Sequence, residues 1–239
     1  MNRIVLITGG TAGIGLGLAE AFIREGDTVV VCGRSQDALH RFSNAHPKHM
    51  AVQADVSDTA ARAAMLDAVQ ARYGRLDILI NNAGTFVERE IAGAPESLEG
   101  LEQEVALNLT APIQLTDEVL RRWPGVSALV FVTSGFALVS PARAPTYGAV
   151  KAGLHGFADG LRHQLASRDI HVLELLPPAT DTQMNADLNV KKLSTAEVAE
   201  ITLEALSHRR PMALPGSTKW LPILLRVAPT IIRRMVGRM

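Results

Sequence analysis

Apolar runs alternate with amphipathic helical patterns along the whole chain. Strand-like apolar runs cover residues 3–8, 28–32, 50–54, 76–80, 128–133, 171–176 and 211–214. Segments with helical periodicity connect them. This alternation is typical of right-handed β-α-β units around a parallel sheet. We therefore expect one α/β domain of the doubly wound Rossmann type, with a mostly or fully parallel sheet of about seven strands.

A glycine-rich segment, residues 8–15, joins the first strand to the first helix. Its glycines include Gly9, Gly13 and Gly15. Glycine permits a tight turn and lets a pyrophosphate approach the backbone at a helix N-terminus. Because strand, glycines and helix coincide, the segment predicts a dinucleotide-binding loop. A turn that only packs the helix against the strand is the alternative interpretation.

The second strand ends at the place where such folds bind the ribose. An acidic residue there would bind the 2′-hydroxyl of NAD, whereas an arginine without an acid suits the 2′-phosphate of NADP. The chain has Arg34 and no acid beside it, which favours NADP. Two alternatives stay open: the cofactor is NAD, or Arg34 is only a solvated residue at the start of a helix. Asp55 follows the third strand and can either meet the adenine amino group or cap the helix that begins near Asp58.

Polar residues also follow later strands. Asn81 and Asn82 precede Ala83 and Gly84, and we expect Asn81 to link neighbouring strands while Asn82 bonds both backbone and cofactor.

Residues 85–97 are expected to form a loop, with Phe86 and Val87 as candidates for a cleft wall. Ser134 lies at the carboxyl end of its strand, the edge where open parallel sheets bind ligands, although serine there is also an ordinary turn residue.

A helix that starts near residue 98 carries Asn108 in its middle and Pro112 soon after. Both residues weaken a helix, so we expect an interruption of the backbone hydrogen bonds at which a water can bind. The alternative is a solvated Asn108 and a proline tolerated at a kink.

Tyr147 and Lys151 are four residues apart at the start of a predicted long helix, so they share one helix face. A neighbouring ammonium stabilises a phenolate, and moving a tyrosine pKa from about 10 toward 7 requires roughly 4 kcal/mol. The pair therefore predicts a tyrosine with a lowered pKa that donates or accepts a proton. An exposed helical pair without chemistry is the alternative.

Composition narrows the class of protein. A chain of 239 residues with 47% hydrophobic content fits one domain. The 24 basic and 24 acidic residues cancel, which excludes a global field directed at nucleic acid or a membrane. Cys32 is the only cysteine, so no internal disulfide forms, in keeping with a reducing compartment. No leader precedes the first strand, and we expect a cytoplasmic protein.

These motifs, in this order and at these spacings, resemble those of a classical short-chain dehydrogenase/reductase over about residues 3–214. The resemblance implies that Tyr147 is the general acid in carbonyl reduction and that Ser134 bonds the carbonyl oxygen. It implies that Lys151 holds the nicotinamide ribose while it acidifies the phenol, and that Asn108 holds a water of the proton relay. No metal is required. The implied cofactor-binding set is Gly9, Thr11, Gly13, Ile14, Gly15, Arg34, Ser35, Asp55, Val56, Asn82, Ala83, Gly84, Tyr147, Lys151, Pro177, Thr180 and Thr182.

The chain departs from the family pattern after the strand 171–176. Pro178 stands where the family has a glycine, and proline fixes φ and removes an N–H, so the backbone near the nicotinamide cannot copy a glycine with positive φ. Thr182 remains to meet the carboxamide. Residues 184–193 are expected to form a mobile lid over the substrate, followed by a helix that Ser194 or Thr195 caps.

The helix after Tyr147 carries small residues, Ala149, Gly153, Gly156 and Gly160, on the side opposite to Tyr147 and Lys151. In the family this helix helps to form the dimer interface, so the resemblance implies a homodimer or homotetramer. Packing within the monomer is the alternative.

We divide the chain into a catalytic domain, residues 1–214, and a C-terminal extension, residues 215–239. The extension mixes apolar and basic residues, and no acidic residue follows Glu204. Arg226, Pro222 and Pro229 break the apolar run well short of the roughly 20 residues that a transmembrane helix needs. Two short helical pieces remain, which fit a subunit interface, a substrate-site lid or a membrane surface; we favour the two protein-bound interpretations.

The resemblance as a whole implies an NADP-dependent oxidoreductase that transfers a hydride between a nicotinamide cofactor and a small-molecule carbonyl or secondary alcohol, with an apolar substrate and no nucleic-acid partner. One alternative is a non-catalytic NAD(P)-binding sensor on the same fold, for which loss of the tyrosine or lysine would be the usual sign. Another is a peripheral membrane protein that acts through residues 219–239. The substrate, the direction of reaction and the pathway are not encoded in these motifs.

Overall fold

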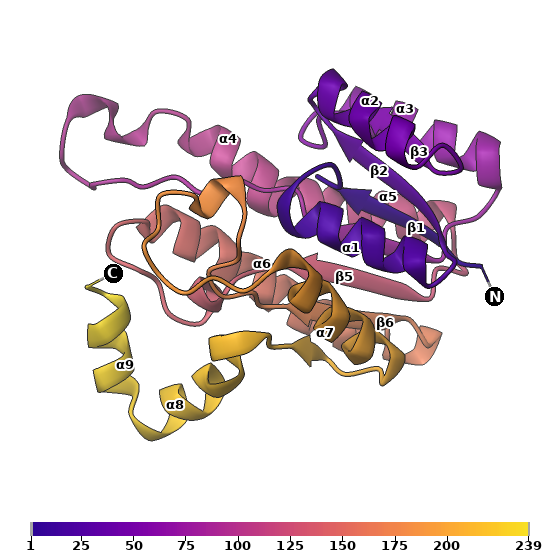
Figure 1. Ribbon diagram of the computed structural model, residues 1–239. Coiled ribbons are helices and arrows are strands. Elements are labelled where there is room, and N and C mark those ends of the chain that lie inside the picture. The colour runs from indigo at the N-terminus through magenta and orange to yellow at the C-terminus, as the bar shows by residue number, and fades with distance from the viewer. Residues whose placement is uncertain (1, 239) are drawn as a thin grey trace.

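The computed structural model describes residues 2–238 and contains one sheet of seven parallel strands in the order β3-β2-β1-β4-β5-β6-β7 (Figure 1). The chain moves outward from β1 to β3 and then returns to place β4 on the other side of β1. This reversal opens a crevice at the carboxyl ends of the strands. The predicted fold class is confirmed. The strands are β1 (Ile4–Thr8), β2 (Thr28–Gly33), β3 (Met50–Gln53), β4 (Ile78–Asn81), β5 (Ala128–Val132), β6 (His171–Leu175) and β7 (Met212–Ala213).

Helices cover both faces of the sheet because both faces of its strands are apolar. Val5 and Ile7 of β1 pack in the cluster that includes α1 and α7, whereas Leu6 packs in the opposite cluster with α3, α5 and α6. The helices are α1 (Gly13–Arg24), α2 (Gln36–Ala45), α3 (Thr59–Tyr73), α4 (Leu101–Val105), α5 (Ala111–Arg122), α6 (Pro145–Gln164), α7 (Thr195–Ser207), α8 (Leu221–Val227) and α9 (Pro229–Val236).

Side-chain caps fix where several helices begin. The N–H of Ala61 donates to the Asp58 carboxylate at 2.7 Å, so Asp58 caps α3. The alternative in which Asp55 caps this helix is therefore wrong, and Asp55 instead accepts hydrogen bonds from Ser57. Ser194 caps α7 in a reciprocal arrangement with Glu197.

The predicted interruption around Asn108 is a π-helical turn, Ala106–Thr110, between α4 and α5. The N–H of Ala111 reaches back five residues to the carbonyl of Ala106. Pro112 follows in the first turn of α5, where its missing N–H leaves the carbonyl of Asn108 without its usual helical donor. The helix therefore widens by one residue at this point.

The small residues of α6 face solvent. Among the described residues, a Cβ added at Gly156 or Gly160 would meet no neighbouring atom within 4 Å, whereas one at Gly153 would touch Leu109. Packing within the monomer thus does not account for Gly156 and Gly160.

The C-terminal extension forms the two short helices that the sequence predicts, and Pro229 opens α9. These helices curve under the segment 183–193 in Figure 1, and Ile232 and Val236 pack against Val139. The boundary between the catalytic domain and the C-terminal extension at residue 214 stays a prediction. Met1, the first residue of the predicted domain, and Met239, the last residue of the extension, lie outside the described residues. Within residues 2–238, no helix is long and apolar enough to span a bilayer.

Candidate active site

Tyr147 and Lys151 lie buried in the first two turns of α6, beside the end of β5. Pro145 opens the helix, which suits its fixed φ. The Lys151 ammonium donates to the carbonyl oxygen of Val132 at 3.0 Å, and its Nζ lies 5.7 Å from the centre of the Tyr147 ring. Ser134 follows β5 at the same edge. The alternative of an exposed pair is therefore wrong.

Asn108 is fully buried and connects the π-helical turn to the loop after β4. Its Nδ2 donates to the carbonyl oxygens of Thr85 at 3.0 Å and Glu104 at 3.2 Å. A Cβ added at Gly84 would lie 2.6 Å from Asn108 Oδ1 and 3.5 Å from Lys151 Nζ. Asn108 and Lys151 thus meet around Gly84, and the solvated alternative is wrong. The water at this break stays a prediction.

Burial controls the acid–base character of the pair. It raises the pKa of Tyr147 to about 12; a hydrogen bond with Ser134 acts in the opposite direction, and the charge of Glu104 adds to the increase. Burial also lowers the pKa of Lys151 to about 8. The predicted lowering of the tyrosine pKa toward 7 is wrong for this structure, because the four-residue spacing indicated a nearby charge but not the loss of water around both groups.

The glycine-rich segment can accommodate a pyrophosphate. Gly9 and Gly13 have φ of 63° and 53°, and a Cβ at Gly15 would lie 2.3 Å from the Gly9 carbonyl oxygen. No side chain caps α1, and its first turn holds no acidic residue, so its first N–H groups are available to an anion. These residues fit the dinucleotide phosphates that the family binds.

The two asparagines after β4 have different roles. The Nδ2 of Asn82 donates to the carbonyl oxygens of Thr8 at 2.8 Å and Gly9 at 3.2 Å, which ties the glycine loop to β4. The Nδ2 of Asn81 donates to Thr116 on α5 at 3.2 Å. The side chain of Asn81 thus has a structural role, as expected, but it ties β4 to the helix layer and not to a neighbouring strand.

The residues proposed to bind the adenosine end lie at the carboxyl ends of β2 and β3. Arg34 is 69% exposed, and its Nη1 is 3.9 Å from an Asp55 Oδ2. A surface pair at this distance contributes little to stability, so the guanidinium is free to bind a phosphate. Ser35 caps α2, and hydrogen bonds from Ser57 lower the pKa of Asp55.

A cavity of about 840 Å³ extends from the glycine-rich segment to α9. All four proposed catalytic residues line it. The proposed cofactor residues that also line it are Gly9, Gly13, Ile14, Asn82, Ala83, Gly84, Pro177 and Thr182, whereas Thr11, Gly15, Arg34, Ser35, Asp55, Val56 and Thr180 do not. Thr180 is fully buried and donates to the carbonyl oxygen of Pro178, so it holds the turn after β6.

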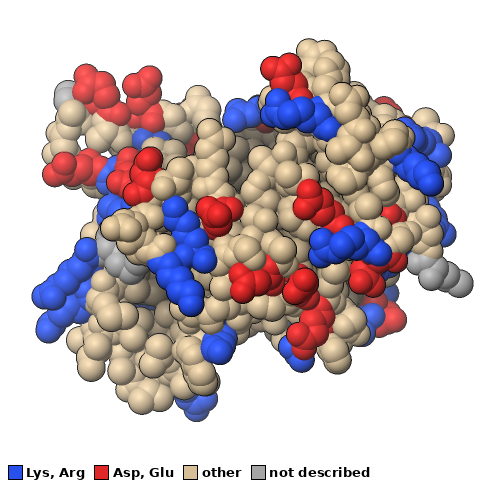
Figure 2. Space-filling view, in the orientation of Figure 1, with Lys and Arg blue, Asp and Glu red and all other residues tan. Residues whose placement is uncertain are grey.

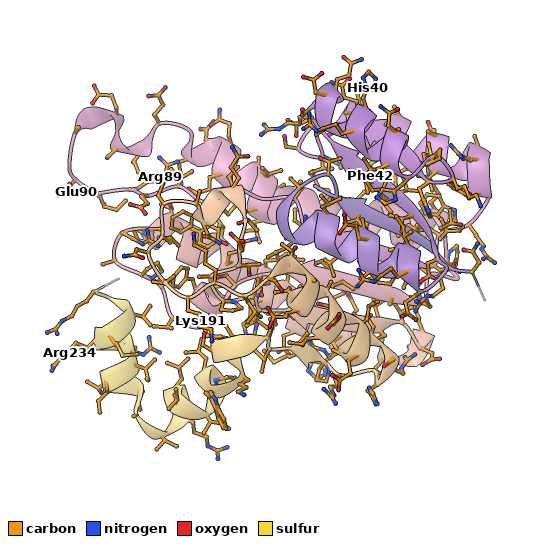
Figure 3. All side chains as sticks on the ribbon, viewed as in Figure 1. His40, Phe42, Arg89, Glu90, Lys191 and Arg234 are labelled. Carbon is orange, nitrogen blue, oxygen red and sulfur yellow. The ribbon has the colours of Figure 1, made fainter. Side chains whose placement is uncertain are left out.

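The far end of the cavity is apolar. The ring of Phe86 meets the Tyr147 ring edge to face, with 4.9 Å between centroids, while Val87 does not line the cavity. Residues of the predicted lid also contribute, and the bridge between Thr180 and Leu193 connects the end of the lid to the turn after β6. Figure 3 labels one of them, Lys191. The apolar lining includes Phe136, Val139, Met184, Leu188, Val190, Leu221, Leu224, Ile232, Met235 and Val236.

Pro178 lines the cavity close to Gly216. Thr182 faces the glycine-rich segment, since a Cβ at Gly13 would lie 3.1 Å from its Cγ2. The effect of Pro178 on nicotinamide geometry stays a prediction.

Glu104 is a buried carboxylate next to the site that the sequence motifs did not predict. Glu104 accepts hydrogen bonds from Arg89 Nε at 3.2 Å and from the Thr146 hydroxyl at 2.9 Å, while its Oε1 is buried without a partner among the described residues. Figure 3 shows Arg89 on the loop that leads to α4. The position of Glu104 one turn before Asn108 was the available signal.

A second buried carboxylate supports the end of β5. Glu174 is 1% exposed on β6 and accepts a hydrogen bond from the Thr133 hydroxyl at 2.6 Å, next to Ser134. Its other oxygen lies 2.8 Å from His155 Nδ1, one turn after Lys151 on α6. A glutamate inside an apolar strand pattern was the signal for this network.

Comparison with known proteins identifies the family of this site. A model described as short chain dehydrogenase matches residues 3–193. The chain belongs to this family. It is an NAD(P)-dependent oxidoreductase of the short-chain dehydrogenase type.

Two relatives and one solved structure illustrate the similarity. The "Uncharacterized oxidoreductase DltE" of Bacillus subtilis is 37% identical over 216 residues, which cover 87% of this chain and 85% of the relative. A 3β-hydroxysteroid dehydrogenase of Mediterraneibacter gnavus is 30% identical over 234 residues, 92% of this chain and 82% of the relative. The short-chain dehydrogenase of Sphingobium yanoikuyae in complex with NADPH is 27% identical, with a TM-score of 0.80 and coverage of 99% of this chain and 97% of that chain.

Proposed function

We propose that this short-chain dehydrogenase reduces a carbonyl group in a bulky apolar molecule to an alcohol, with NADPH as the reductant. The observation that carries this proposal is the continuity of the cavity. Ser134, Tyr147, Lys151 and Asn108 lie at one end, and apolar side chains from the lid segment and from α8 and α9 form the other.

The residues of the chain have distinct roles in this reaction. When bound, the nicotinamide cofactor supplies the hydride that adds to the carbonyl carbon. The Ser134 hydroxyl accepts from the Phe136 N–H at 3.1 Å, and its own hydrogen, which bonds Tyr147 before substrate enters, turns to donate to the substrate oxygen. Tyr147 gives its proton to that oxygen, so the phenol O–H bond breaks as the alcohol O–H bond forms, and the Lys151 ammonium stabilises the phenolate.

The phenol of Tyr147 carries its proton at neutral pH, as an ordinary tyrosine also does, and carbonyl reduction consumes this form.

The preference for NADPH rests on Arg34. We predict that Arg34→Asp weakens NADPH binding much more than NADH binding, because it replaces a phosphate partner with a like charge. Dissociation constants for both cofactors, measured by titration, test this. Arg41→Asp, an exposed arginine on α2, is the matched control and should leave both constants unchanged. Equal losses for the two cofactors, or a parent that prefers NADH, would contradict the proposal.

The apolar end of the cavity supports a bulky substrate. One relative is named as a 3β-hydroxysteroid dehydrogenase. A steroid ketone has the rigid apolar bulk that would exclude water from the apolar end of this cavity, while the cofactor occupies the end at the glycine-rich segment.

The experiment is NADPH oxidation against ketones and aldehydes of increasing apolar size, from short-chain ketones to steroid ketones. We expect kcat/KM to rise with apolar surface, because each buried methylene contributes about 0.8 kcal/mol. NADPH binding without turnover of any carbonyl would instead favour the non-catalytic sensor. A preference for small polar carbonyls would refute the apolar substrate class.

A further inference from the structure

The helices α8 and α9, with the turn that precedes α8, carry a concentration of exposed apolar side chains. Six large apolar residues between positions 220 and 235 are 41–76% exposed, and we call them the outer face: Trp220, Ile223, Leu224, Val227, Ile231 and Met235. A monomer does not gain stability from leaving such residues in water, so the outer face indicates a surface that binds a partner.

On α8, the apolar residues surround the helix. Leu221 and Leu225 turn inward and pack in the small cluster around Val139. Ile223 and Val227 project from the opposite side and are 56% and 76% exposed. Core packing therefore uses only one side of this helix.

On α9, the apolar arc is wider than the core can cover. At about 100° per residue, Ile231, Met235, Ile232 and Val236 span one continuous arc of roughly 140°. The half with Ile232 and Val236 is buried, at 6% and 8% exposure, whereas Ile231 and Met235 are 68% and 59% exposed.

The charges around the outer face have one sign. From residue 205 to the end the chain has no acidic residue but seven basic ones. Arg226, Arg233 and Arg234 are exposed beside the apolar residues. Figure 2 shows basic and no acidic atoms on the part of the surface that α8 and α9 form in this view, and Figure 3 shows Arg234 pointing away from the molecule.

We propose that the outer face docks on an anionic lipid surface. Apolar side chains of two short helices can enter the interface between headgroups and acyl chains, while the arginines contact the lipid phosphates. A second copy of the chain fits this face less well, because a two-fold contact would bring the arginines of both copies together without acidic partners from the same segment. The inner sides of α8 and α9 still pack against the domain and line the cavity, and lipid binding by the outer face is a second role of the same helices.

The docking surface also opens toward the cavity. Leu224 and Met235 line the cavity and at the same time are 41% and 59% exposed within the outer face. An apolar carbonyl compound dissolved in the bilayer can therefore enter without crossing water. This consequence rests on the proposed function, whereas lipid binding itself does not.

The test is cosedimentation of the full-length chain with vesicles of phosphatidylcholine that contain phosphatidylglycerol, compared with pure phosphatidylcholine, in the absence of substrate. We expect binding to the anionic vesicles that weakens as salt rises. Ile223→Glu combined with Val227→Glu should lower the bound fraction at least about fivefold. Ile91→Glu combined with Leu98→Glu is the matched control, because these residues are 56% and 50% exposed on another part of the surface. Arg226→Ala with Arg233→Ala should also weaken binding, whereas Arg24→Ala with Arg41→Ala should not.

The proposal is overturned if the chain stays in the supernatant with anionic vesicles, or if the control variants lose binding as much as the outer-face variants. A change of sedimentation coefficient in the outer-face variant without any vesicle binding would assign the face to a second copy instead. Because vesicle binding is read without cofactor or substrate, an inactive chain that still binds vesicles would refute only the proposed function. If the chain binds vesicles and reduces ketones, the rate with a ketone preloaded into anionic vesicles should fall in the outer-face variant while the rate with a water-soluble ketone stays constant.

Discussion

Burial raises the pKa of the Tyr147 phenol to about 12, so the phenol keeps its proton at pH 7 and well above it. The same burial lowers the pKa of Lys151 to about 8. A proton donor that is fully protonated thus lies beside a cation that stabilises its conjugate base. The two opposite shifts share one cause, the removal of water from both charged forms.

Replacing Tyr147 with Phe tests this proton donor. The substitution removes only the hydroxyl, so we expect turnover of a carbonyl substrate to fall at least about a hundredfold while NADPH still binds. Steady-state kinetics and a cofactor titration measure the two effects. The other tyrosine provides the control, since Tyr73→Phe removes a hydroxyl that has no partner among the described residues and should leave turnover unchanged. Near-normal turnover of Tyr147→Phe would show that another group supplies the proton.

The carboxylate of Glu104 makes the pH dependence testable. Its negative charge raises the pKa of Tyr147, so Glu104→Gln should lower that pKa. Reduction uses the protonated phenol and the Lys151 ammonium, so kcat/KM falls first as pH rises through the Lys151 pKa of about 8 and again as pH rises through the Tyr147 pKa. We expect the second, higher fall of the pH profile to move to lower pH in the variant.

The exposed Glu102, two residues earlier on α4, is the control for charge alone, and Glu102→Gln should keep the parental profile. Arg89 loses its buried partner in Glu104→Gln, which costs stability by up to about 3–5 kcal/mol, so thermal unfolding must show that the variant is folded. An unchanged profile in a folded variant, or a move to higher pH, would contradict the role of Glu104.

Each of the two C-terminal helices has one side that packs against the domain and one side that is exposed. The inner side of α9 packs with Val139 and closes the cavity, while its outer side remains exposed. A helix of eight residues is too short to be stable alone, so the inner contacts hold it in place. Substrate size and surface binding should therefore respond to different residues of the same helix.

Ile232→Ala combined with Val236→Ala tests the inner side. Both residues line the cavity and are buried, so their truncation should raise KM for bulky ketones several-fold, lower the melting temperature and spare NADPH binding. Ile223→Ala with Ile231→Ala removes comparable apolar groups from the outer face. This control variant should keep the parental KM for substrates dissolved in water and the parental melting temperature. Equal effects of the two double variants on KM would mean that α9 does not discriminate substrates.

At the scale of the whole molecule, the exposed glycines of α6 point to association between subunits. Gly156 and Gly160 leave room for another helix to approach, and no side chain from residues 2–238 lies within 4 Å of a Cβ added at either position. We predict a homodimer or homotetramer in which α6 packs against its symmetry mate.

Gly156→Gln should lower the oligomeric state as measured by sedimentation velocity. A Cβ at this position meets nothing in the part of the chain that the structure describes, so the monomer should remain folded and the change reports on the interface. Gly125→Gln is the control, because Gly125 is also exposed and also has no atom within 4 Å of an added Cβ. A parent chain that sediments as a monomer at micromolar concentration would end this prediction.

The sequence by itself determined the sheet, the order of its elements and the set of residues at its carboxyl edge. Short apolar runs such as residues 3–8, which alternate with amphipathic helical patterns, indicate buried strands, and parallel strands bring their ends to one edge. Ser134, Tyr147 and Lys151 therefore meet in the structure as expected. The helix interruption at Asn108 could also be predicted, because Pro112 removes a backbone donor at a known position.

Only the tertiary structure decided the properties that depend on distance and burial. The pKa of Tyr147 moves up rather than down because Phe86 and other packed neighbours exclude water, and no local spacing reports on such packing. The contacts of Glu104 with Arg89 join segments 15 residues apart through a loop whose path the sequence does not reveal. The tail was ambiguous for the same reason: its periodicity indicates apolar helices, but which side of α9 meets Val139 and which meets solvent depends on where the rest of the chain places the cavity.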